Sequence, residues 1–318
     1  MDTERFRIPL SLMIGLALVA TWPGVMASSQ NAPALDVSER FLSWAVDGNQ
    51  DLARLGTAIS AAGDVNADSF DDLIVSASNF DGASSDTGRA YLYLGSSIGL
   101  GAMPAWHEDG TISGGGFAWK VTAAGDVNGD GFDDVLVGDR PDLGQSPFYL
   151  YYGGPNGPST TPGWSQAGST AASAGDVNGD GYDDIVVGWA GYSNDQAWEG
   201  VAWVFLGSST GIGASPSWTL EGNQYQAYLG WDVSGAGDTN GDGYDDVLIG
   251  APYYDAAFTE CGAAYVFLGS PSGLQSTPAW TRFGDANFAY LGRMVDTAGD
   301  VNRDGYDEVV VWIQAYSQ

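Results

Sequence analysis

The chain has few residues that could cross-link it, carry positive charge or catalyse a reaction. Cysteine occurs once, at Cys261, so an internal disulfide is excluded and stability must come from the core, the sheets and metal ions. Histidine also occurs once, at His107, so a histidine-based metal site or catalytic triad lacks its other members. Lysine and arginine total 10 against 40 acidic residues, a formal net charge of −30. This balance argues against nucleic acid and anionic membrane surfaces as partners.

Only one long apolar run occurs, and it lies at the N-terminus. Two arginines precede an apolar stretch from Ile8 to Ala20, and Val25-Met26-Ala27 then offers a small-residue cleavage site. This run is shorter than the roughly 20 residues that a membrane-spanning helix needs. We therefore predict a signal peptide at 1–27, followed by an N-terminal segment at 28–43. The protein is expected to be extracytoplasmic (secreted, periplasmic or at the cell surface), without membrane insertion.

The most informative feature of the sequence is an acidic motif of ten residues that occurs five times. The copies read GDVNADSFDD from position 63, GDVNGDGFDD from 125, GDVNGDGYDD from 175, GDTNGDGYDD from 237 and GDVNRDGYDE from 299. After the first glycine, the form D-x-N-x-D-G-x-x-D places oxygen donors at positions 1, 3, 5 and 9 of a nine-residue loop. Calcium is the ion that such hard donors suit. Each copy holds four acidic residues, so the five loops account for 20 of the 40.

The motif predicts up to five calcium sites, three of them strong. In the strong copies the donors are Asp126, Asn128, Asp130 and Asp134; Asp176, Asn178, Asp180 and Asp184; and Asp238, Asn240, Asp242 and Asp246. The outer copies offer Asp64, Asn66, Asp68 and Asp72, and Asp300, Asn302, Asp304 and Glu308. These two should bind more weakly, because Ser69 replaces a glycine in the first and Arg303 adds a positive charge to the fifth. The ions are expected to be structural rather than catalytic.

The acids at position 8 of the loop, Asp133, Asp183 and Asp245, fall outside the donor pattern, and we expect them to face solvent or to cap a turn. An EF-hand is excluded, since it would need glutamate at position 12 and flanking helices. Position 12 is instead valine or isoleucine within a short β-branched run, such as DDVLIGA at 245–251. Such runs are too short for helices and predict strands.

Five tryptophans alternate with the loops and define a repeat of about 62 residues: Trp44, Trp106, Trp164, Trp218 and Trp280. The predicted units lie near 44–105, 106–163, 164–217, 218–279 and 280–318. Each contains four short strand patterns separated by Gly, Pro and Ser turns, except the last, which stops after two. Four-stranded antiparallel units at this spacing predict an all-β fold, a β-propeller.

The combination of motifs resembles a known family. Residues 229–252, with the pattern L-G-x-x-V-x-x-A-G-D-x-N-x-D-G-Y-D-D-V-x-I-G-A-P, and the following G-x-A-Y-V-F-L-G-S at 262–270 are similar to the FG-GAP repeat. This repeat builds the propellers of integrin α-subunits and occurs in many exported bacterial proteins; the resemblance spans about 44–313. It implies calcium in the loops between first and second strands, away from the ligand face. It also implies seven blades, so five units with the last incomplete indicate a five-bladed variant or part of a seven-bladed ring.

Function is expected in the loops at the opposite end of the strands, which differ between units. They carry aromatic residues that could hold a peptide or stack on sugar rings: Trp189, Tyr192, Trp198, Tyr225, Tyr253 and Tyr254, with Tyr228, Phe258, Phe288 and Tyr290 nearby. The sequence has no histidine pair and no Cys-His arrangement, so we expect no enzyme. The leading hypothesis is a calcium-binding propeller for adhesion or protein–protein interaction, integrin-α-like. The alternative is a carbohydrate-binding lectin or the accessory domain of a secreted hydrolase. The ligand is thus a protein or a glycan, and the oligomeric state is open.

Overall fold

The computed structural model describes residues 44–140 and 146–314 of the chain. The predicted signal peptide at 1–27 and the segment at 28–43 lie outside these residues. All regular elements in the described part of the chain are β-strands, as the short β-branched runs predicted. No helix among the described residues is long and apolar enough to cross a membrane.

Eighteen strands form four four-stranded antiparallel sheets and one two-stranded sheet in the described residues. Sheet 1 contains β1 (Leu55–Gly63), β2 (Asp72–Ala77), β3 (Arg89–Tyr93) and β4 (Trp106–Asp109). Sheet 2 contains β5 (Lys120–Gly125), β6 (Asp134–Gly138), β7 (Ser146–Tyr151) and β8 (Trp164–Gly168). Sheet 3 contains β9 (Thr170–Gly175), β10 (Asp184–Trp189), β11 (Val201–Phe205) and β12 (Trp218–Glu221). Sheet 4 contains β13 (Val233–Gly237), β14 (Asp246–Ala251), β15 (Ala263–Phe267) and β16 (Trp280–Phe283), and sheet 5 contains β17 (Val295–Gly299) and β18 (Glu308–Val311).

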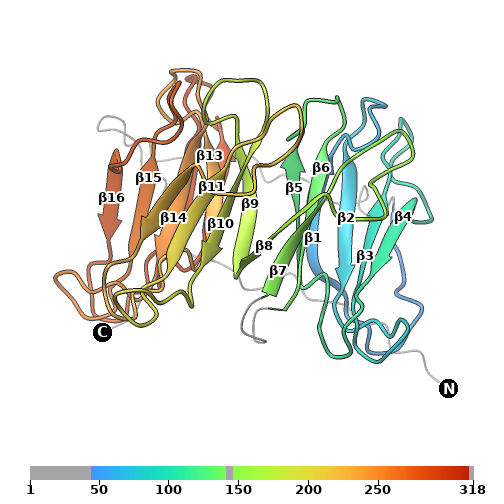
Figure 1. Cartoon of the computed structure of the whole chain (residues 1–318), viewed down its shortest axis with the longest axis horizontal. Helices are drawn as coiled ribbons and strands as arrows, with labels where there is room; N and C mark the ends of the chain where they lie inside the picture. Colours follow the sequence, from blue (N-terminus) through green and yellow to red (C-terminus); the bar gives the residue numbers. More distant parts are fainter. Residues whose placement is uncertain (1–43, 141–145, 315–318) are drawn as a thin grey trace, which may run out of the picture.

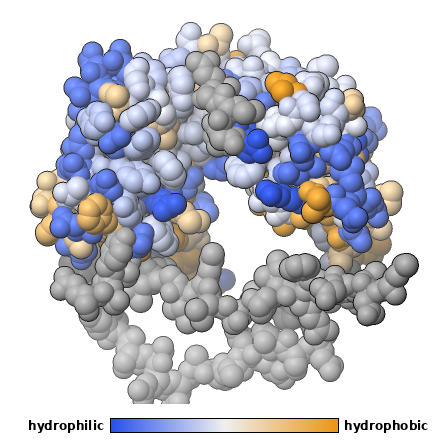
Figure 2. Space-filling view, turned by 90° about the horizontal axis from the view of Figure 1, so that it is seen from below, coloured by the Kyte–Doolittle hydropathy of each residue, from blue (hydrophilic) through white to orange (hydrophobic). Residues whose placement is uncertain are grey.

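The sheets stand side by side in chain order, and each is a simple meander (Figure 1). Their first strands, β1, β5, β9, β13 and β17, are neighbours from one sheet to the next. Seen along the strands, the described residues form an arch around a hollow (Figure 2). The first strands therefore line the inside of the arch. The strands that begin with a recurring tryptophan, β4, β8, β12 and β16, are the outermost strands of their sheets. The predicted unit boundaries had assigned each of them to the following repeat.

The hydrophobic core lies between the sheets rather than within any one of them. Between sheets 1 and 2, for example, Ala62, Val65 and Leu92 pack against Val121 and Val135, all of them almost fully buried. Equivalent clusters join sheets 2 and 3, 3 and 4, and 4 and 5. Stability of one sheet therefore depends on its neighbour, which is the behaviour of a repeat protein.

The recurring tryptophans connect neighbouring sheets. Trp106 on β4 packs edge-on against Tyr151 of sheet 2 (ring centroids 5.4 Å apart), and its Nε1 donates to the carbonyl of Ser159 (3.2 Å). Trp164 and Trp218 make the same pair of contacts with the sheets that follow them. Trp44 belongs to no strand, yet it packs against Tyr93 of sheet 1 and donates to a main-chain carbonyl in the same way. Their regular spacing thus has a packing cause.

The outward faces of sheets 1 and 5 have no neighbouring sheet within the described residues. Ile59 on β1 is 61% exposed, whereas Val121, at the same position of β5, is 4% exposed. At the other end of the array, Val301 is 62% exposed, although its equivalent Val65 is fully buried. A cavity of about 510 Å³ lies against the outward face of sheet 1 and is lined in part by Leu55, Arg89 and Tyr91. Within the described residues, sheet 5 consists of the two strands β17 and β18.

Candidate functional site

Each acidic loop joins the first two strands of its sheet, and its carboxylates fold the loop by accepting hydrogen bonds from its own main chain. In sheet 2, Asp126 at position 1 accepts the N–H groups of Gly129 (2.7 Å), Asp130 (3.1 Å) and Gly131 (2.8 Å). Gly131 has φ +87°, as the predicted left-handed turn requires. Ser69, in the first copy, adopts φ 72° at the same position, so the loop is retained there with backbone strain.

The aspartate at position 9 is the most buried acid of each of the first four loops. Asp134 and Asp184 are both 0% exposed, although they lie on hairpins at the edge of the molecule. Asp134 accepts the N–H groups of Val127 (3.2 Å) and Gly153 (2.7 Å), which connects the loop to the turn after β7. Burial raises the pKa of Asp134 and of Asp184 to about 7, against the lowering effect of these main-chain bonds. Burial also raises the pKa of Asp72 and Asp246, so each of the first four loops holds a carboxylate whose negative charge is poorly compensated.

Of the two expectations for the position-8 acids, that they face solvent or that they cap a turn, the structure contradicts the first. Asp133 of sheet 2 reaches back to sheet 1, where its Oδ2 accepts the N–H of Asp64, the first residue of the preceding loop (2.7 Å). Asp183 and Asp245 repeat this bond to Asp126 (2.8 Å) and Asp176 (2.9 Å), and Asp307 repeats it in sheet 5. These aspartates thus fasten each acidic loop to the next. In the sequence, the recurrence of an acid at position 8, one residue before the donor at position 9, was the available sign of this second role.

The invariant glycine before each loop is explained by the same contact. A Cβ on Gly125 would lie 2.1 Å from Oδ2 of Asp183, and φ is +75° there. Gly63, Gly175 and Gly237 are equally crowded by the aspartate of the next sheet. Gly299, which no further sheet covers in the described residues, has nothing within 4 Å of that point. Close approach of sheets, rather than turn geometry alone, therefore requires glycine here.

The chemistry of these loops fits a calcium ion, since they offer only oxygen donors and contain a buried, poorly compensated carboxylate. In residues 44–140 and 146–314, however, no three or more His, Cys, Asp or Glu side chains are gathered closely enough to hold a metal. The carboxylates of positions 1 and 5 are instead occupied by main-chain N–H groups, as in Asp130, which accepts from Phe132 (3.1 Å). The predicted metal ligands therefore lie in the expected loops, without converging on a common point.

At the opposite end of the strands, six aromatic side chains from three consecutive sheets form a continuous row. We call it the aromatic row; it consists of Trp198, Tyr228, Trp231, Tyr253, Phe288 and Tyr290. Ring centroids are 6.4 Å apart between Trp198 and Tyr228, and 5.1 Å between Tyr228 and Tyr253. The row continues from Tyr253 to Tyr290 (5.1 Å) and from there to Phe288 (6.3 Å), while Trp231 contacts Tyr228 (6.0 Å) and Tyr253 (5.7 Å).

The aromatic row is both exposed and strained. Trp198 is 45% exposed and Phe288 is 43% exposed. Trp198 (φ 53°), Tyr228 (φ 51°), Phe288 (φ 60°) and Tyr290 (φ 48°) all adopt the left-handed backbone region. Such strain in non-glycine residues costs about 1–3 kcal/mol each and gathers at functional sites. The surrounding loops thus hold large apolar side chains in solvent at a cost to stability.

Three of the other predicted ligand residues pack against strands instead of joining the aromatic row. Trp189 and Tyr192 pack against Trp203 of β11, with centroid distances of 6.1 and 5.9 Å. Tyr254 packs against Phe283 of β16 (5.7 Å). Tyr225 is 57% exposed in the connection from sheet 3 to sheet 4. Of the six predicted residues, only Trp198 and Tyr253 lie in the row, and the sequence argument did not name Trp231.

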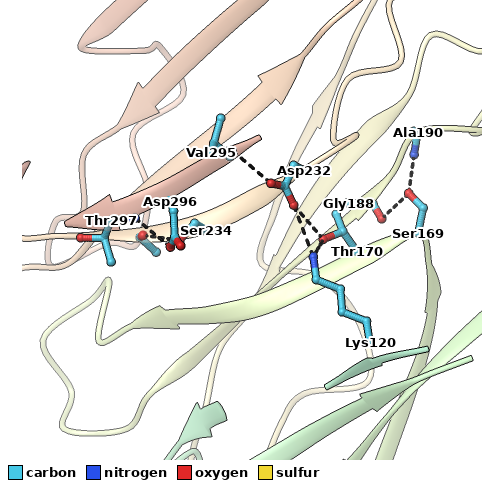
Figure 3. A network of polar contacts seen from close by, with 11 residues as sticks. Lys120, Ser169, Thr170, Gly188, Ala190, Asp232, Ser234, Val295, Asp296 and Thr297 are labelled. Atoms are coloured by element: carbon cyan, nitrogen blue, oxygen red, sulfur yellow. Dashed lines mark hydrogen bonds and ion pairs between the residues drawn. The ribbon is translucent and has the colours of Figure 1, made fainter. Parts of the chain in front are cut away.

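A polar network on the inner strands was also missed by the sequence argument (Figure 3). Lys120 on β5 is the only lysine of the chain, and that rarity was the available signal. Its Nζ lies 3.3 Å from Oδ1 of Asp232 and also donates to Thr170. The other oxygen of Asp232 accepts the N–H of Val295 on β17 (3.0 Å). One carboxylate thus links residues of sheets 2 to 5 along the inside of the arch.

These sheets, meandering in order around a hollow and joined by inter-sheet cores, define an all-β protein of the β-propeller class. Two FG-GAP repeats are matched at residues 55–93 and 229–267, and an FG-GAP-like repeat at residues 126–187. The chain therefore contains FG-GAP repeats. The predicted fold and the predicted resemblance are both confirmed.

The curated relatives are integrin α-subunits. The chain is 39% identical over 103 residues to mouse integrin alpha-IIb, which covers 30% of this chain and 10% of the relative. It is 30% identical over 256 residues to integrin alpha pat-2 of Caenorhabditis elegans, covering 79% of this chain and 17% of the relative. The chain thus spans less than a fifth of the length of these relatives.

Two solved structures show a weaker similarity to this chain, in both sequence identity and TM-score. A rhamnogalacturonan lyase from Bacillus licheniformis aligns with a TM-score of 0.40 and 18% identity, covering 73% of this chain and 49% of the lyase. The exotype rhamnogalacturonan lyase YesX aligns with a TM-score of 0.38 and 13% identity, covering 80% and 55%. Because both TM-scores lie below 0.5, neither structure bears on the activity of this chain.

Proposed function

We propose that the chain is a non-enzymatic, extracytoplasmic interaction module that binds a ligand, most simply a protein, along the aromatic row. The observation that carries the proposal is the combination of exposure and strain: Trp198 and Phe288 are held in left-handed backbone with more than two fifths of their surface in solvent. Rigid aromatic side chains supply much of the binding energy in protein interfaces. An adhesive role follows from the same proposal and from the integrin relatives.

Calcium in the acidic loops would support this function from the other end of the sheets. The ion would be held by the carboxylates of positions 1, 5 and 9 and the amide oxygen of position 3, for instance Asp126, Asp130, Asp134 and Asn128. It would supply positive charge next to Asp134, whose pKa burial raises to about 7. Since the position-8 aspartates join successive loops, an ordered loop would also order its neighbour.

The test is binding of the labelled chain to arrays of extracellular proteins, with variants inside and outside the aromatic row. Trp198→Ala and Tyr253→Ala should each weaken binding to any protein recognised by the unaltered chain by about tenfold or more. Trp189→Ala is the matched control, because this tryptophan packs against Trp203 instead. Equal loss in all three variants, or none in the row variants, would contradict the proposal.

A glycan is the second candidate ligand. Trp198 and Tyr228 lie nearly parallel, with an interplanar angle of 8°, and a flat aromatic surface of this kind suits the apolar face of a sugar ring. A glycan array with the same three variants tests it. Saccharide binding that depends on Trp198 and Tyr253 would favour a lectin, and silence across the array beside a positive protein array would favour adhesion.

A further inference from the structure

The loop between β10 and β11 contains an unusual buried charge. Glu199 is 0% exposed, and its Oε1 accepts the N–H groups of Asn194 (2.8 Å) and Gln196 (3.4 Å). Its Oε2 is buried without a hydrogen-bond partner, and no other side-chain oxygen or nitrogen among the described residues is in that position. Burying a carboxylate oxygen without a partner is strongly unfavourable, so this oxygen indicates a missing counter-charge.

The corresponding residues of sheets 1 and 4 are donors. Thr87, which precedes β3 by two residues as Glu199 precedes β11, donates from Oγ1 to the carbonyl of Phe80 (3.3 Å). In sheet 4, Cys261 donates from Sγ to the carbonyl of Tyr254 (3.5 Å). In both loops the acceptor lies seven residues before the donor. In sheets 1 and 4 this position is therefore held by a short side chain that donates a hydrogen bond.

In sheet 3 the residue seven before Glu199 is Tyr192. Its carbonyl accepts the N–H of Gly200 (3.1 Å), just as the carbonyl of Phe80 accepts that of Gly88 (3.0 Å), so the loop backbone is conserved in shape. A carboxylate at position 199 has no proton to donate to this carbonyl. Glu199 thus brings an acceptor to the loop position where sheets 1 and 4 have a donor, and an unpartnered carboxylate oxygen is a group that a cation satisfies.

A second carboxylate, that of Glu221, shares a hydrogen-bond partner with Glu199. Glu221 on β12 pairs in register with Val201, where sheet 1 pairs Asp109 with Arg89 in an ion pair. Sheet 3 therefore has an acidic residue, Glu221, at the position of Asp109, but Val201 in place of the basic Arg89. Asn194, whose N–H holds Oε1 of Glu199, also donates from Nδ2 to Oε2 of Glu221 (3.4 Å), so one residue contacts both carboxylates.

We propose that this loop binds a calcium-type divalent cation, with Glu199, Glu221 and the carbonyl of Tyr192 as protein ligands and water completing the shell. The donors are all hard oxygens with two negative charges, a set that calcium accepts. Because Trp198 directly precedes Glu199, the cation would fix the first residue of the aromatic row. The site lies at the end of the sheets opposite the acidic loops and is separate from the calcium sites proposed there.

The test is the number of calcium ions bound to the purified chain, measured by equilibrium dialysis and metal analysis. Glu199→Gln should bind one ion fewer than the unaltered chain, and Glu221→Gln should bind the same ion about tenfold more weakly. Glu260→Gln, in the equivalent loop of sheet 4, is the matched control and should leave the count unchanged. If the acidic loops bind no calcium, the unaltered chain should still bind one ion and Glu199→Gln none.

A different result would overturn the cation site. If Glu199 is instead a neutral acid that donates to the carbonyl of Tyr192, Glu199→Gln supplies an amide donor in its place. The variant would then bind as many ions as the unaltered chain, and its thermal midpoint in chelator would be equal or higher. Circular dichroism of each variant establishes that a lost ion does not reflect an unfolded chain, and Glu221→Gln gives a second measurement if Glu199→Gln fails to fold.

Discussion

The two ends of each sheet differ in how strictly they repeat. At the acidic-loop end, the bond from position 1 of one loop to position 8 of the next recurs at four successive junctions, with distances of 2.7–2.9 Å. At the opposite end, the residue nine positions before the loop glycine is Gly116 in sheet 2 but Tyr228 and Tyr290 in sheets 4 and 5. All three share the left-handed backbone (φ 60°, 51° and 48°). At the acidic-loop end both the side chains and the backbone conformation repeat from sheet to sheet, whereas at the opposite end only the backbone conformation repeats.

This difference indicates that the acidic-loop end holds the sheets together, whereas the opposite end tolerates changes of side chain. A residue at the acidic-loop end contacts the next sheet, so changing it disturbs two sheets at once. A residue at the opposite end projects from a loop whose shape is already fixed by main-chain bonds, such as that from the N–H of Tyr228 to the carbonyl of Trp198 (3.1 Å). New side chains can be added there without loss of the fold.

Removing calcium should have the largest effect. If three acidic loops bind calcium about tenfold below its ambient concentration, linkage gives about 4 kcal/mol in total. Chelator should therefore lower the thermal midpoint by roughly 10 °C. Differential scanning calorimetry with millimolar calcium and with chelator measures this shift. An unchanged thermal midpoint would show that calcium does not stabilise the acidic loops.

The glycines before the loops provide a matched pair. Gly125→Ala places a Cβ against the carboxylate of Asp183 at φ +75°, and should cost about 3 kcal/mol through contact and backbone strain together. Gly299→Ala has the same strain at φ +65° but open space, and should cost about 1 kcal/mol. Urea unfolding measures both. Equal costs would mean that the backbone angle, not the neighbouring sheet, requires glycine.

The position-8 aspartates test the junction itself. Asp183→Ala removes the acceptor for the N–H of Asp126 and should cost about 1–3 kcal/mol in the free energy of unfolding. Asp71→Ala should cost less than about 0.5 kcal/mol, because Asp71 is exposed on sheet 1. Chemical denaturation in the presence of chelator compares them without metal effects. A large loss in Asp71→Ala would show that this residue has a partner outside the described residues.

The pH dependence of the calcium-free chain should carry the signature of the buried acids. Asp134 and Asp184 have pKa values of about 7 in the folded state, raised by burial, against an ordinary value near 3.8. The folded state therefore binds protons more firmly, so stability in chelator should fall as pH rises from about 4 through about 7. Asp134→Asn, which cannot titrate, should show a weaker dependence. Identical pH profiles for the two chains would contradict the raised pKa of Asp134.

Tyr228→Gly should change stability least and binding most. It gives sheet 4 the residue that sheet 2 has at Gly116, and relieves about 1–2 kcal/mol of left-handed strain while losing ring contacts with Tyr253. The thermal midpoint should therefore stay within a few degrees, whereas binding through the aromatic row should be lost. A collapse in stability would assign Tyr228 a packing role instead.

Much of this structure follows from local pattern. The β-branched run after each loop is too short for a helix, and the form of the loop fixes a tight hairpin, so sequence alone predicts strands, sheets and their repetition. The strain at Ser69 was also foreseeable, because any residue with a Cβ at the glycine position must accept positive φ. The sequence was also sufficient to place all predicted metal donors in equivalent loops.

Other features depend on residues far apart in the sequence. Asp133 looked free because its partner, the N–H of Asp64, lies 69 residues away in another sheet. Trp189 and Trp198 looked equivalent as loop aromatics, yet only packing decides that the first faces Trp203 and the second joins the aromatic row. The sequence by itself determined the repeat, because each strand pairs with the next strand in the chain, as Leu55 does with Ala77. Tertiary structure decided which side chains join sheets and which remain free for a ligand, because that depends on the neighbouring sheet.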